Sequence, residues 1–333
     1  MKRVGNLMNQ IVDYDNIQLA FIKSCRGKQA KREVIEFRKN YDENISEIRK
    51  SLLSGDIQVG NYNYFKIFDP KERLICAASF QERVIHHAIM NVCHRYFERT
   101  LIYDTYATRI GKGIYKALDK AKFAASRYQY VAKLDYRKYF DSIDHGVLKE
   151  KLGRMFKDKE LLNLFNKIID SYCVVEGKGV PIGNLTSQYF ANYYLSALDH
   201  KIKEVLNVPI YLRYMDDILI MDNNREKLKA DVRYIQEYSD NELKLRLKEP
   251  IYRECRTGVQ FLGYIVKPYR LLLNGRSKKR FRDKINYYSN CFEKGLISEN
   301  EYQQHLLPLL AFTSYANEKA FMNATIMGIN QRL

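Results

Sequence analysis

The chain has 333 residues, of which 46% are hydrophobic and 29% are charged, as in an ordinary folded protein with room for more than one lobe. Lys and Arg together number 56 against 39 Asp and Glu, and the resulting formal charge of +17 predicts a polyanionic partner: nucleic acid or, less often, an anionic membrane surface. No apolar run reaches the roughly 18 residues that a membrane-spanning helix needs. The basic start of the chain lacks an apolar segment of signal-peptide length. We therefore expect a cytoplasmic protein that does not enter a membrane.

The first half of the chain reads as helices around one extended segment. Apolar residues from Val34 to Leu52 recur at spacings of three and four and predict a helix over 31–54 that ends at Gly55. Residues 62–79 read as extended and broken at Pro70. Further helices are predicted over 80–101 and 114–126.

The second half places strands among helices. Residues 128–140 begin like a strand, 209–222 read as strand, tight turn and strand, and 259–266 as a further strand. Helices are predicted over 185–206, with Asn184 or Thr186 as the N-cap, over 225–239, and from 276 to the end. Because strands and helices do not alternate regularly, the pattern favours an α+β fold with an antiparallel sheet.

Basic residues are concentrated after the last predicted strand. They are Lys267, Arg270, Arg276, Lys278, Lys279, Arg280, Arg282 and Lys284. Asp283 is the only acidic residue in this range of the sequence. Such a run predicts a track for duplex phosphates, although a solvated helix face would have the same composition. The global charge favours the phosphate track.

The stretch RYMDDILI, 213–220, places Asp216 and Asp217 at the tip of the predicted hairpin. Adjacent carboxylates repel each other, and a divalent cation removes that cost. The alternative is a solvated turn with two ordinary surface acids. Asp135, at the end of the strand-like run VAKL, is the best third acid. Three carboxylates could hold two Mg²⁺ ions that activate a 3′-hydroxyl and stabilise a leaving pyrophosphate.

These segments resemble the ordered motifs of reverse transcriptases. YMDD is similar to motif C, LDYRKYFDSIDH (134–145) to motif A, and GVPIGNLTSQYFANYYLSALDH (179–200) to motif B. FLGY (261–264) resembles the primer-grip hairpin, and RLICAASFQERVIHHAI (73–89) and YATRIGKGIYKAL (106–118) resemble the fingers motifs. The similarity covers roughly 60–285. It implies a right-hand polymerase fold and RNA-templated DNA synthesis from deoxynucleoside triphosphates.

The resemblance also implies a division into domains. Fingers with an N-terminal extension would occupy 1–127, or 1–127 would also include part of the palm, and the palm would occupy 128–266, with finger elements near 150–180. A basic helical thumb would occupy 267–333.

Roles for individual residues follow from the motifs that they match. Asp135 and Asp216 would bind the metal ions, with Asp217 as the third acid and the Tyr136 carbonyl completing one metal shell. Phe140 would be a steric gate against a ribose 2′-hydroxyl, or alternatively a plain core residue.

Other matched residues would contact the nucleotide. Arg73, Arg109 and Lys66 would hold the incoming triphosphate, since the arginine fork meets phosphate oxygens with two hydrogen bonds. Lys248 would donate a proton to the leaving pyrophosphate. Asp141 and Asp144 suit salt bridges, or a helix cap at His145, better than metal binding.

Motif B departs from the common pattern at Ile182 and ends in Ser187-Gln188. This form of motif B is similar to the one found in diversity-generating retroelement reverse transcriptases. The resemblance implies copying of a template-repeat RNA with errors opposite adenine, replacement of a variable repeat by the mutated cDNA (mutagenic retrohoming), and a small helical accessory protein. Ile182 and Gln188 would then contact the nucleotide. We hypothesise that the apolar Ile182 loosens geometric checking of the new pair; the alternative is that it only packs.

Other interpretations stay open. A retron, group II-like or phage-defence reverse transcriptase of ordinary fidelity would share most of these motifs. An RNA-templated RNA polymerase typically carries Gly-Asp-Asp and a smaller gate residue, so Tyr214-Met215 and Phe140 argue against it. A catalytically inactive RNA-binding protein would not need all three carboxylates.

Overall fold

The computed structural model describes residues 2–68 and 72–330. The chain divides into two compact units. Unit 1 comprises Met1–Tyr103, Tyr136–Val205 and Ile235–Leu247, and unit 2 comprises Asp104–Asp135, Leu206–Tyr234 and Lys248–Leu333. Within the described ranges, no helix has the length and apolar character needed to cross a membrane.

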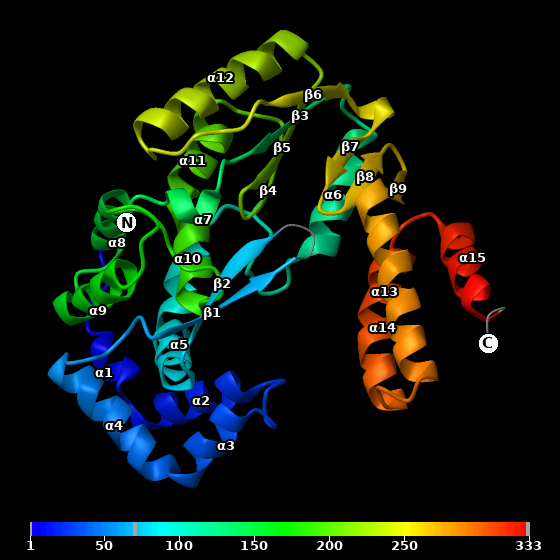
Figure 1. Ribbon diagram of the computed structural model, residues 1–333. Coiled ribbons are helices and arrows are strands. Elements are labelled where there is room, and N and C mark those ends of the chain that lie inside the picture. Colours follow the sequence, from blue (N-terminus) through cyan, green and yellow to red (C-terminus); the bar gives the residue numbers. More distant parts are fainter. Residues whose placement is uncertain (1, 69–71, 331–333) are drawn as a thin grey trace. The chain divides into compact units, whose positions relative to one another are not determined.

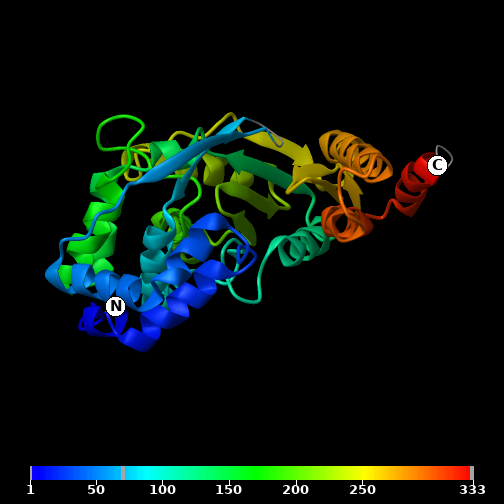
Figure 2. The ribbon, with the colours of Figure 1, turned by 60° about the horizontal axis from the view of Figure 1, so that its bottom comes forward.

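The N-terminal part of unit 1 is helical and packs against one long helix, α5 (Figures 1 and 2). Its helices are α1 (Met8–Ile11), α2 (Tyr14–Cys25), α3 (Arg32–Lys39), α4 (Tyr41–Ser54) and α5 (Phe80–Thr100). The prediction of a single helix over 31–54 was wrong, because Asn40 leaves the helical conformation with φ −119° and ψ 45°. The apolar spacing continues across this break, so Val34, Ile45 and Leu52 are buried all the same.

The extended segment of unit 1 is a hairpin of β1 (Tyr62–Ile67) and β2 (Arg73–Ala78). Its strands are antiparallel, with Lys66 opposite Leu74. Pro70, the predicted break, lies outside the described residues. Ser79 then caps α5 by accepting a hydrogen bond from the Glu82 amide at 3.3 Å.

Unit 1 is completed by shorter helices. They are α7 (Tyr139–Ser142), α8 (His145–Met155), α9 (Lys159–Asp170), α10 (Leu185–Tyr194) and α11 (Ser196–His200), followed by a π-helical turn (Lys201–Val205). The continuous helix predicted over 185–206 is instead α10, α11 and the π-helical turn in succession, and Leu195, which separates α10 from α11, keeps αR dihedral angles. Asn184 occupies the N-cap position of α10, but its side chain makes no capping hydrogen bond.

Unit 2 contains the larger sheet, with strand order β4-β5-β3-β6 and every pairing antiparallel. The strands are β3 (Tyr130–Asp135), β4 (Ile210–Tyr214), β5 (Asp217–Asp222) and β6 (Ile251–Glu254). Helix α6 (Ile114–Ala125) packs on this sheet through its alanines and Leu118. Helix α12 (Arg225–Asn241) begins in unit 2 and ends in unit 1.

A smaller antiparallel sheet follows a 3₁₀ turn at Cys255–Thr257. Its strands are β7 (Val259–Phe261), β8 (Tyr264–Lys267) and β9 (Arg270–Leu273). The single strand predicted over 259–266 is instead a hairpin, because Leu262 and Gly263 turn the chain with φ of 49° and 91°. The resemblance of FLGY to a primer-grip hairpin agrees with this turn.

The described chain ends in three helices, as predicted for the residues past 276. They are α13 (Gly275–Glu293), α14 (Glu299–Ser314) and α15 (Lys319–Asn330). Figure 1 shows α13 and α14 side by side, and Phe281 and Ile285 of α13 form a small core with Leu306 and Leu309 of α14. Antiparallel sheets among many helices confirm the α+β class.

Candidate active site

The paired strands of unit 2 bring the three predicted carboxylates to one end of the larger sheet. Asp135 is the last residue of β3, and its Cα partner across the ladder is Asp217, the first residue of β5. Tyr214 of β4 also pairs with Asp217, which leaves Met215 and Asp216 as a two-residue turn. Met215 has φ 57°, the sign that a type II′ hairpin requires at its first central residue.

Two lysine ammonium groups lie close to these carboxylates and offset part of their negative charge. The Lys248 ammonium lies 2.5 Å from Asp135 Oδ2, and the Lys248 amide donates to the Asp135 carbonyl at 2.8 Å. The Lys133 ammonium lies 3.3 Å from Asp217 Oδ1. Sequence reasoning singled out Lys248 and missed Lys133. The period of two along a strand could have found it, since Lys133 points to the same face as Asp135.

Asp217 is the most perturbed of the three acids. Burial raises its pKa to about 6, the Lys133 ammonium opposes the rise, and the carboxylates of Asp135 and Asp216 add to it. Its Oδ1 is enclosed and makes no hydrogen bond, even though Lys133 is near. Because no hydrogen bond satisfies it, this oxygen can accept a cation, and in this structure the Lys133 ammonium is the cation beside it.

The donor set fits a hard divalent cation. Mg²⁺ prefers oxygen ligands and is often bound through one or two carboxylates, which Asp135, Asp216 and Asp217 provide. The unsatisfied oxygen of Asp217 agrees with such a site. In the part of the chain that the structure describes, however, no three Asp, Glu, His or Cys side chains converge as a ready ligand set. The lysines hold Asp135 and Asp217 instead, and magnesium binding stays a prediction.

Arg213 supports the turn from within β4, and sequence reasoning missed this role. Its side chain is fully buried, and its guanidinium donates to the Met215 carbonyl at 2.9 Å. The available signal was a charged residue in an otherwise apolar strand. Such a residue must find buried partners.

Arg109 lies in the same unit as the carboxylates. The segment before it is tied to β4, because Tyr106 N donates to the Arg213 carbonyl and Arg213 N donates to the Asp104 carbonyl. The Arg109 guanidinium donates to Thr105 Oγ1 at 2.7 Å and to the Thr105 carbonyl at 3.1 Å. Its position is therefore set by the same strand that leads to the Met215–Asp216 turn.

The other predicted nucleotide contacts belong to unit 1. Arg73 and Lys66 are exposed on the β1–β2 hairpin, where Lys66 pairs with Glu72 at 2.6 Å. Ile182 accepts a hydrogen bond from the Cys76 amide through its carbonyl at 2.9 Å, so the motif B segment is joined to β2. Gln188 is exposed on α10.

The residues that follow Asp135 lead into unit 1. Tyr136 is buried, and its hydroxyl lies 2.9 Å from the Ser239 hydroxyl. Phe140 is half-buried on α7, with its ring beside that of Tyr139. The structural role predicted for Asp144 is confirmed: it caps α8 by accepting from the Val147 amide at 3.0 Å and pairs with Lys244.

The predicted phosphate track spans β8, β9 and α13 of unit 2. Lys267 lies in β8, Arg270 in β9, and the other six basic residues in α13. Lys278 pairs with Glu318, whereas the side chains of Arg276 and Lys279 are exposed. Arg276 lies in the first turn of α13, where the helix dipole disfavours cations.

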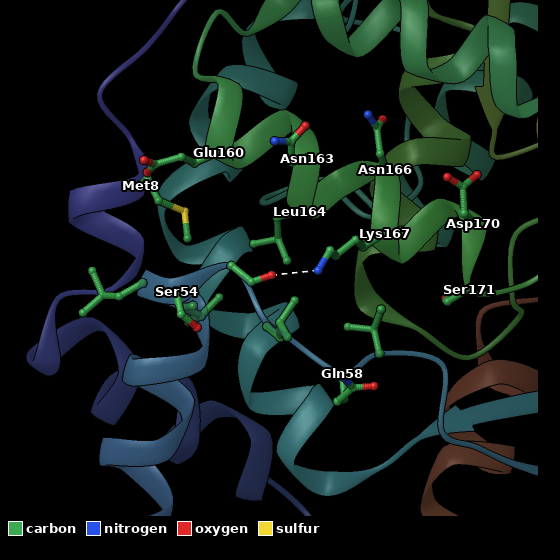
Figure 3. Close-up of a pocket in the computed structure, with 15 residues that line it drawn as sticks. Met8, Ser54, Gln58, Glu160, Asn163, Leu164, Asn166, Lys167, Asp170 and Ser171 are labelled. Atoms are coloured by element: carbon green, nitrogen blue, oxygen red, sulfur yellow. Dashed lines mark hydrogen bonds between the residues drawn. The ribbon is translucent and has the colours of Figure 1, made fainter.

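Unit 1 also contains a cleft of about 900 Å³ between α4 and α9 (Figure 3). Its polar lining includes Asn163, Lys167 and Asp170, and Lys167 donates to the Gly55 carbonyl at 2.7 Å. It contains none of the predicted site residues.

Residues 68–266 match the reverse transcriptase (RNA-dependent DNA polymerase) family. The chain belongs to the reverse transcriptase family. It is 25% identical over 220 residues to the retron Ec73 reverse transcriptase of Escherichia coli, covering 59% of this chain and 64% of that protein. It is 22% identical over 332 residues to the COX1/OXI3 intron 2 protein of Saccharomyces cerevisiae, covering 74% and 38%.

A solved structure of apo telomerase from Candida tropicalis is similar to this reverse transcriptase in fold. The TM-score is 0.51 at 12% identity, covering 69% of this chain and 53% of that one. The right-hand polymerase fold is thereby confirmed. The chain spans less than two thirds of the length of each of these three proteins.

Proposed function

We propose that the protein is an RNA-directed DNA polymerase. The observation that carries this proposal is the placement of Asp135, Asp216 and Asp217 at one end of the β3–β5 ladder in a chain of the reverse transcriptase family. The deoxynucleoside triphosphates are its substrates, and the growing cDNA is its product.

Asp135 and Asp216 would hold two Mg²⁺ ions, with Asp217 as the third acid and the Tyr136 carbonyl completing one shell. Bound there, the ions supply a polarised 3′-hydroxyl and charge neutralisation at the leaving pyrophosphate. Lys133 and Lys248 balance the carboxylates until the site is loaded.

The remaining residues bind, orient and select the nucleotide. Arg73, Arg109 and Lys66 hold the triphosphate, and Phe140 excludes a ribose 2′-hydroxyl. Lys248 donates the proton that the leaving pyrophosphate takes up. Its ammonium lies 2.5 Å from Asp135 Oδ2, which places a proton donor beside the proposed metal site.

The finer proposal is mutagenic copying. Ile182 and Gln188 in motif B support an enzyme that miscopies template adenines of a template-repeat RNA, for mutagenic retrohoming in a diversity-generating retroelement. A small helical accessory protein would then be a partner. The eight basic residues from Lys267 to Lys284 would follow the phosphates of the cDNA–RNA duplex.

A second candidate is a retron or group II-like reverse transcriptase of ordinary fidelity. The similarity to the retron Ec73 reverse transcriptase favours it. A phage-defence enzyme falls in the same class. An inactive RNA-binding protein is less well supported, since all three carboxylates are present.

Extension of a DNA primer on an RNA template, with Mg²⁺ and all four dNTPs, tests these proposals. We expect synthesis that the Asp216→Asn/Asp217→Asn variant loses, with errors concentrated opposite adenine when products are sequenced. Faithful synthesis would select the second candidate. No synthesis, even with the native RNA and accessory protein added, would reject the polymerase.

The error spectrum has its own matched pair of variants. Ile182→Gln should lower errors at template adenine, because a polar side chain there can brace the nucleotide. Ile182→Leu keeps the apolar character and should not. Equal spectra for both variants and the wild type would reject a role for Ile182 in fidelity.

A further inference from the structure

A second group of basic side chains surrounds a pocket of about 640 Å³ in unit 1. None of the residues that line it belongs to the proposed catalytic or nucleotide site. The lining residues are Arg137, Lys178, Gln236, Asp240, Lys244, Arg246 and Leu247. Four of the seven are cations and one is an acid, so the pocket carries an excess of positive charge.

Backbone hydrogen bonds fix the segments that carry these cations. Arg137 N donates to the Arg246 carbonyl at 2.9 Å, which places the two arginines on adjacent segments of the chain. Lys178 is held in a tight turn, since its amide donates to the Val175 carbonyl and its carbonyl accepts from the Val174 amide, both at 2.9 Å. Hydrogen bonds therefore hold the backbone segments that carry these cations.

Lys244 is held both by its backbone and by its side chain. It adopts a left-handed φ of 52°, and its ammonium lies 3.0 Å from Asp144 Oδ2. Asp144 in turn caps α8. Burial would raise the pKa of Asp144, but the Val147 amide and the Lys244 ammonium outweigh it and lower that pKa. Lys244 is thus the one cation of the pocket with a counter-charge of its own.

The other three cations have no such partner. Within residues 2–68 and 72–330, no carboxylate lies within ion-pair distance of Arg137, Lys178 or Arg246. The pocket's four cations outnumber the nearby acids, Asp240 in the lining and Asp144 beside Lys244, so a net repulsion remains that a polyanion relieves. The lining contains no aromatic ring on which a base could stack. These features favour phosphate groups over bases as the ligand.

We propose that this pocket binds the backbone phosphates of single-stranded RNA, without reading its sequence. The choice of RNA rests on the proposed function. Arg137 and Arg246 lie on neighbouring segments of the chain and would contact phosphate oxygens through their forked donors, and Lys178 would add a point charge. Free polyphosphate shares this chemistry and is the other possible source of the ligand.

The test measures RNA binding by the full chain without Mg²⁺ or dNTPs. An unstructured, labelled uridine RNA is titrated by fluorescence anisotropy over a series of salt concentrations. In Arg137→Gln/Arg246→Gln the slope of log Kobs against log salt should flatten by about 1.4, since each phosphate contact to a single strand contributes about 0.7. The matched control is Arg26→Gln/Arg99→Gln, which removes two exposed arginines of unit 1 outside the pocket.

The outcomes separate specific contacts from overall charge. A flatter slope for the pocket variant alone supports the proposal, and equal slopes for both variants overturn it. Loss of tripolyphosphate binding with unchanged RNA binding would assign the pocket to free polyphosphate and overturn the RNA assignment. Should the double variant fail to fold, Lys178→Gln replaces it, with an expected change of about 0.7.

Binding and synthesis are independent measurements in this design. A chain that binds RNA with the predicted slope but extends no primer would retain the pocket and reject the polymerase. If the wild type extends primers and the pocket variant shows no change of slope, the polymerase is retained and the RNA-binding pocket is rejected.

Discussion

At the scale of single residues, Arg213 shows how the hairpin tip is held. A fully buried charge costs several kcal/mol unless hydrogen bonds satisfy it. The Arg213 guanidinium donates to the carbonyl of Met215, one of the two residues of the turn that presents Asp216. The cost of burying the charge is thus offset by a contact that fixes the turn. We infer that Arg213 positions the carboxylates without touching substrate.

Arg213→Met tests this inference because methionine replaces the unbranched stem of arginine and has no donor. The free energy of unfolding should fall by about 1–3 kcal/mol, because the half-buried Met215 carbonyl loses its hydrogen bond. Primer extension should fall more strongly than RNA binding. Urea unfolding and steady-state kinetics are the measurements. The matched control is Arg253→Met on β6, where the arginine is exposed. Wild-type stability and rate in Arg213→Met would contradict the inference.

The buried histidine His86 shows what residue patterns can and cannot predict. Its place on a predicted helix next to Ala88 and Ile89 predicts a satisfied or exposed side chain rather than a metal ligand. The structure agrees in part: Nδ1 lies 3.1 Å from Thr186 Oγ1, and Nε2 lies 3.3 Å from Glu82 Oε1. Glu82 and His86 share one face of α5, so their pairing could be predicted. Thr186 lies 100 residues away, and only the tertiary fold brings it there.

At the scale of elements, apolar periodicity predicted which segments are helices better than where they end. Helices over 80–101 and 114–126 agree with α5 and α6 to within one residue. The break at Asn40 was missed because the apolar period runs on through it. The hairpin carrying Asp216 and Asp217 was predictable because a tight turn separates two apolar runs. Lys133 and Arg213 were not assigned, since their roles depend on which strands become neighbours.

The segment that carries Ile182 is joined to the β1–β2 hairpin by close backbone contact. Gly183 has φ 130°, a conformation that is essentially restricted to glycine. A Cβ at this position would lie 2.9 Å from the Cys76 carbonyl oxygen. That contact adjoins the hydrogen bond from Cys76 N to the Ile182 carbonyl. Glycine therefore permits the approach that holds Ile182 against β2.

Gly183→Ala should consequently disturb more than stability. The backbone strain alone costs about 1–3 kcal/mol, and displacement of Ile182 should change the error spectrum of the cDNA. Gly177→Ala is the matched control, because Gly177 also has a positive φ, 70°, but nothing lies within 4 Å of its added Cβ. Urea unfolding and product sequencing separate the two effects. Similar losses in both variants would show that strain acts alone, without the contact to β2.

At the scale of the whole molecule, the charge of +17 predicts a polyanionic partner but not where it binds. The run from Lys267 to Lys284 could be read from the sequence because its members are neighbours in the chain. The pocket around Arg137 and Arg246 could not, since its cations come from three separate segments that only the fold gathers. We infer two phosphate-binding surfaces, one in each unit.

Two measurements on one variant can show whether the residues from Lys267 to Lys284 bind phosphates or only form a solvated helix face. Arg276→Gln/Lys279→Gln/Arg282→Gln should flatten the salt slope for an RNA–DNA duplex by about 2.7, taking about 0.9 per contact as for duplex DNA. Removing Arg276 from the first turn of α13 should also stabilise the fold by about 0.3–1 kcal/mol, because it relieves the opposing helix dipole. Anisotropy and urea unfolding measure the two changes.

A gain in stability together with a loss of duplex binding would mean that these cations serve binding at the expense of the helix. The matched control, Lys39→Gln/Lys50→Gln/Arg99→Gln, removes three exposed cations of unit 1. It has the same change in net charge and should alter the slope much less. Equal slopes in the two triple variants would assign duplex binding to overall charge, and α13 would then present an ordinary solvated face.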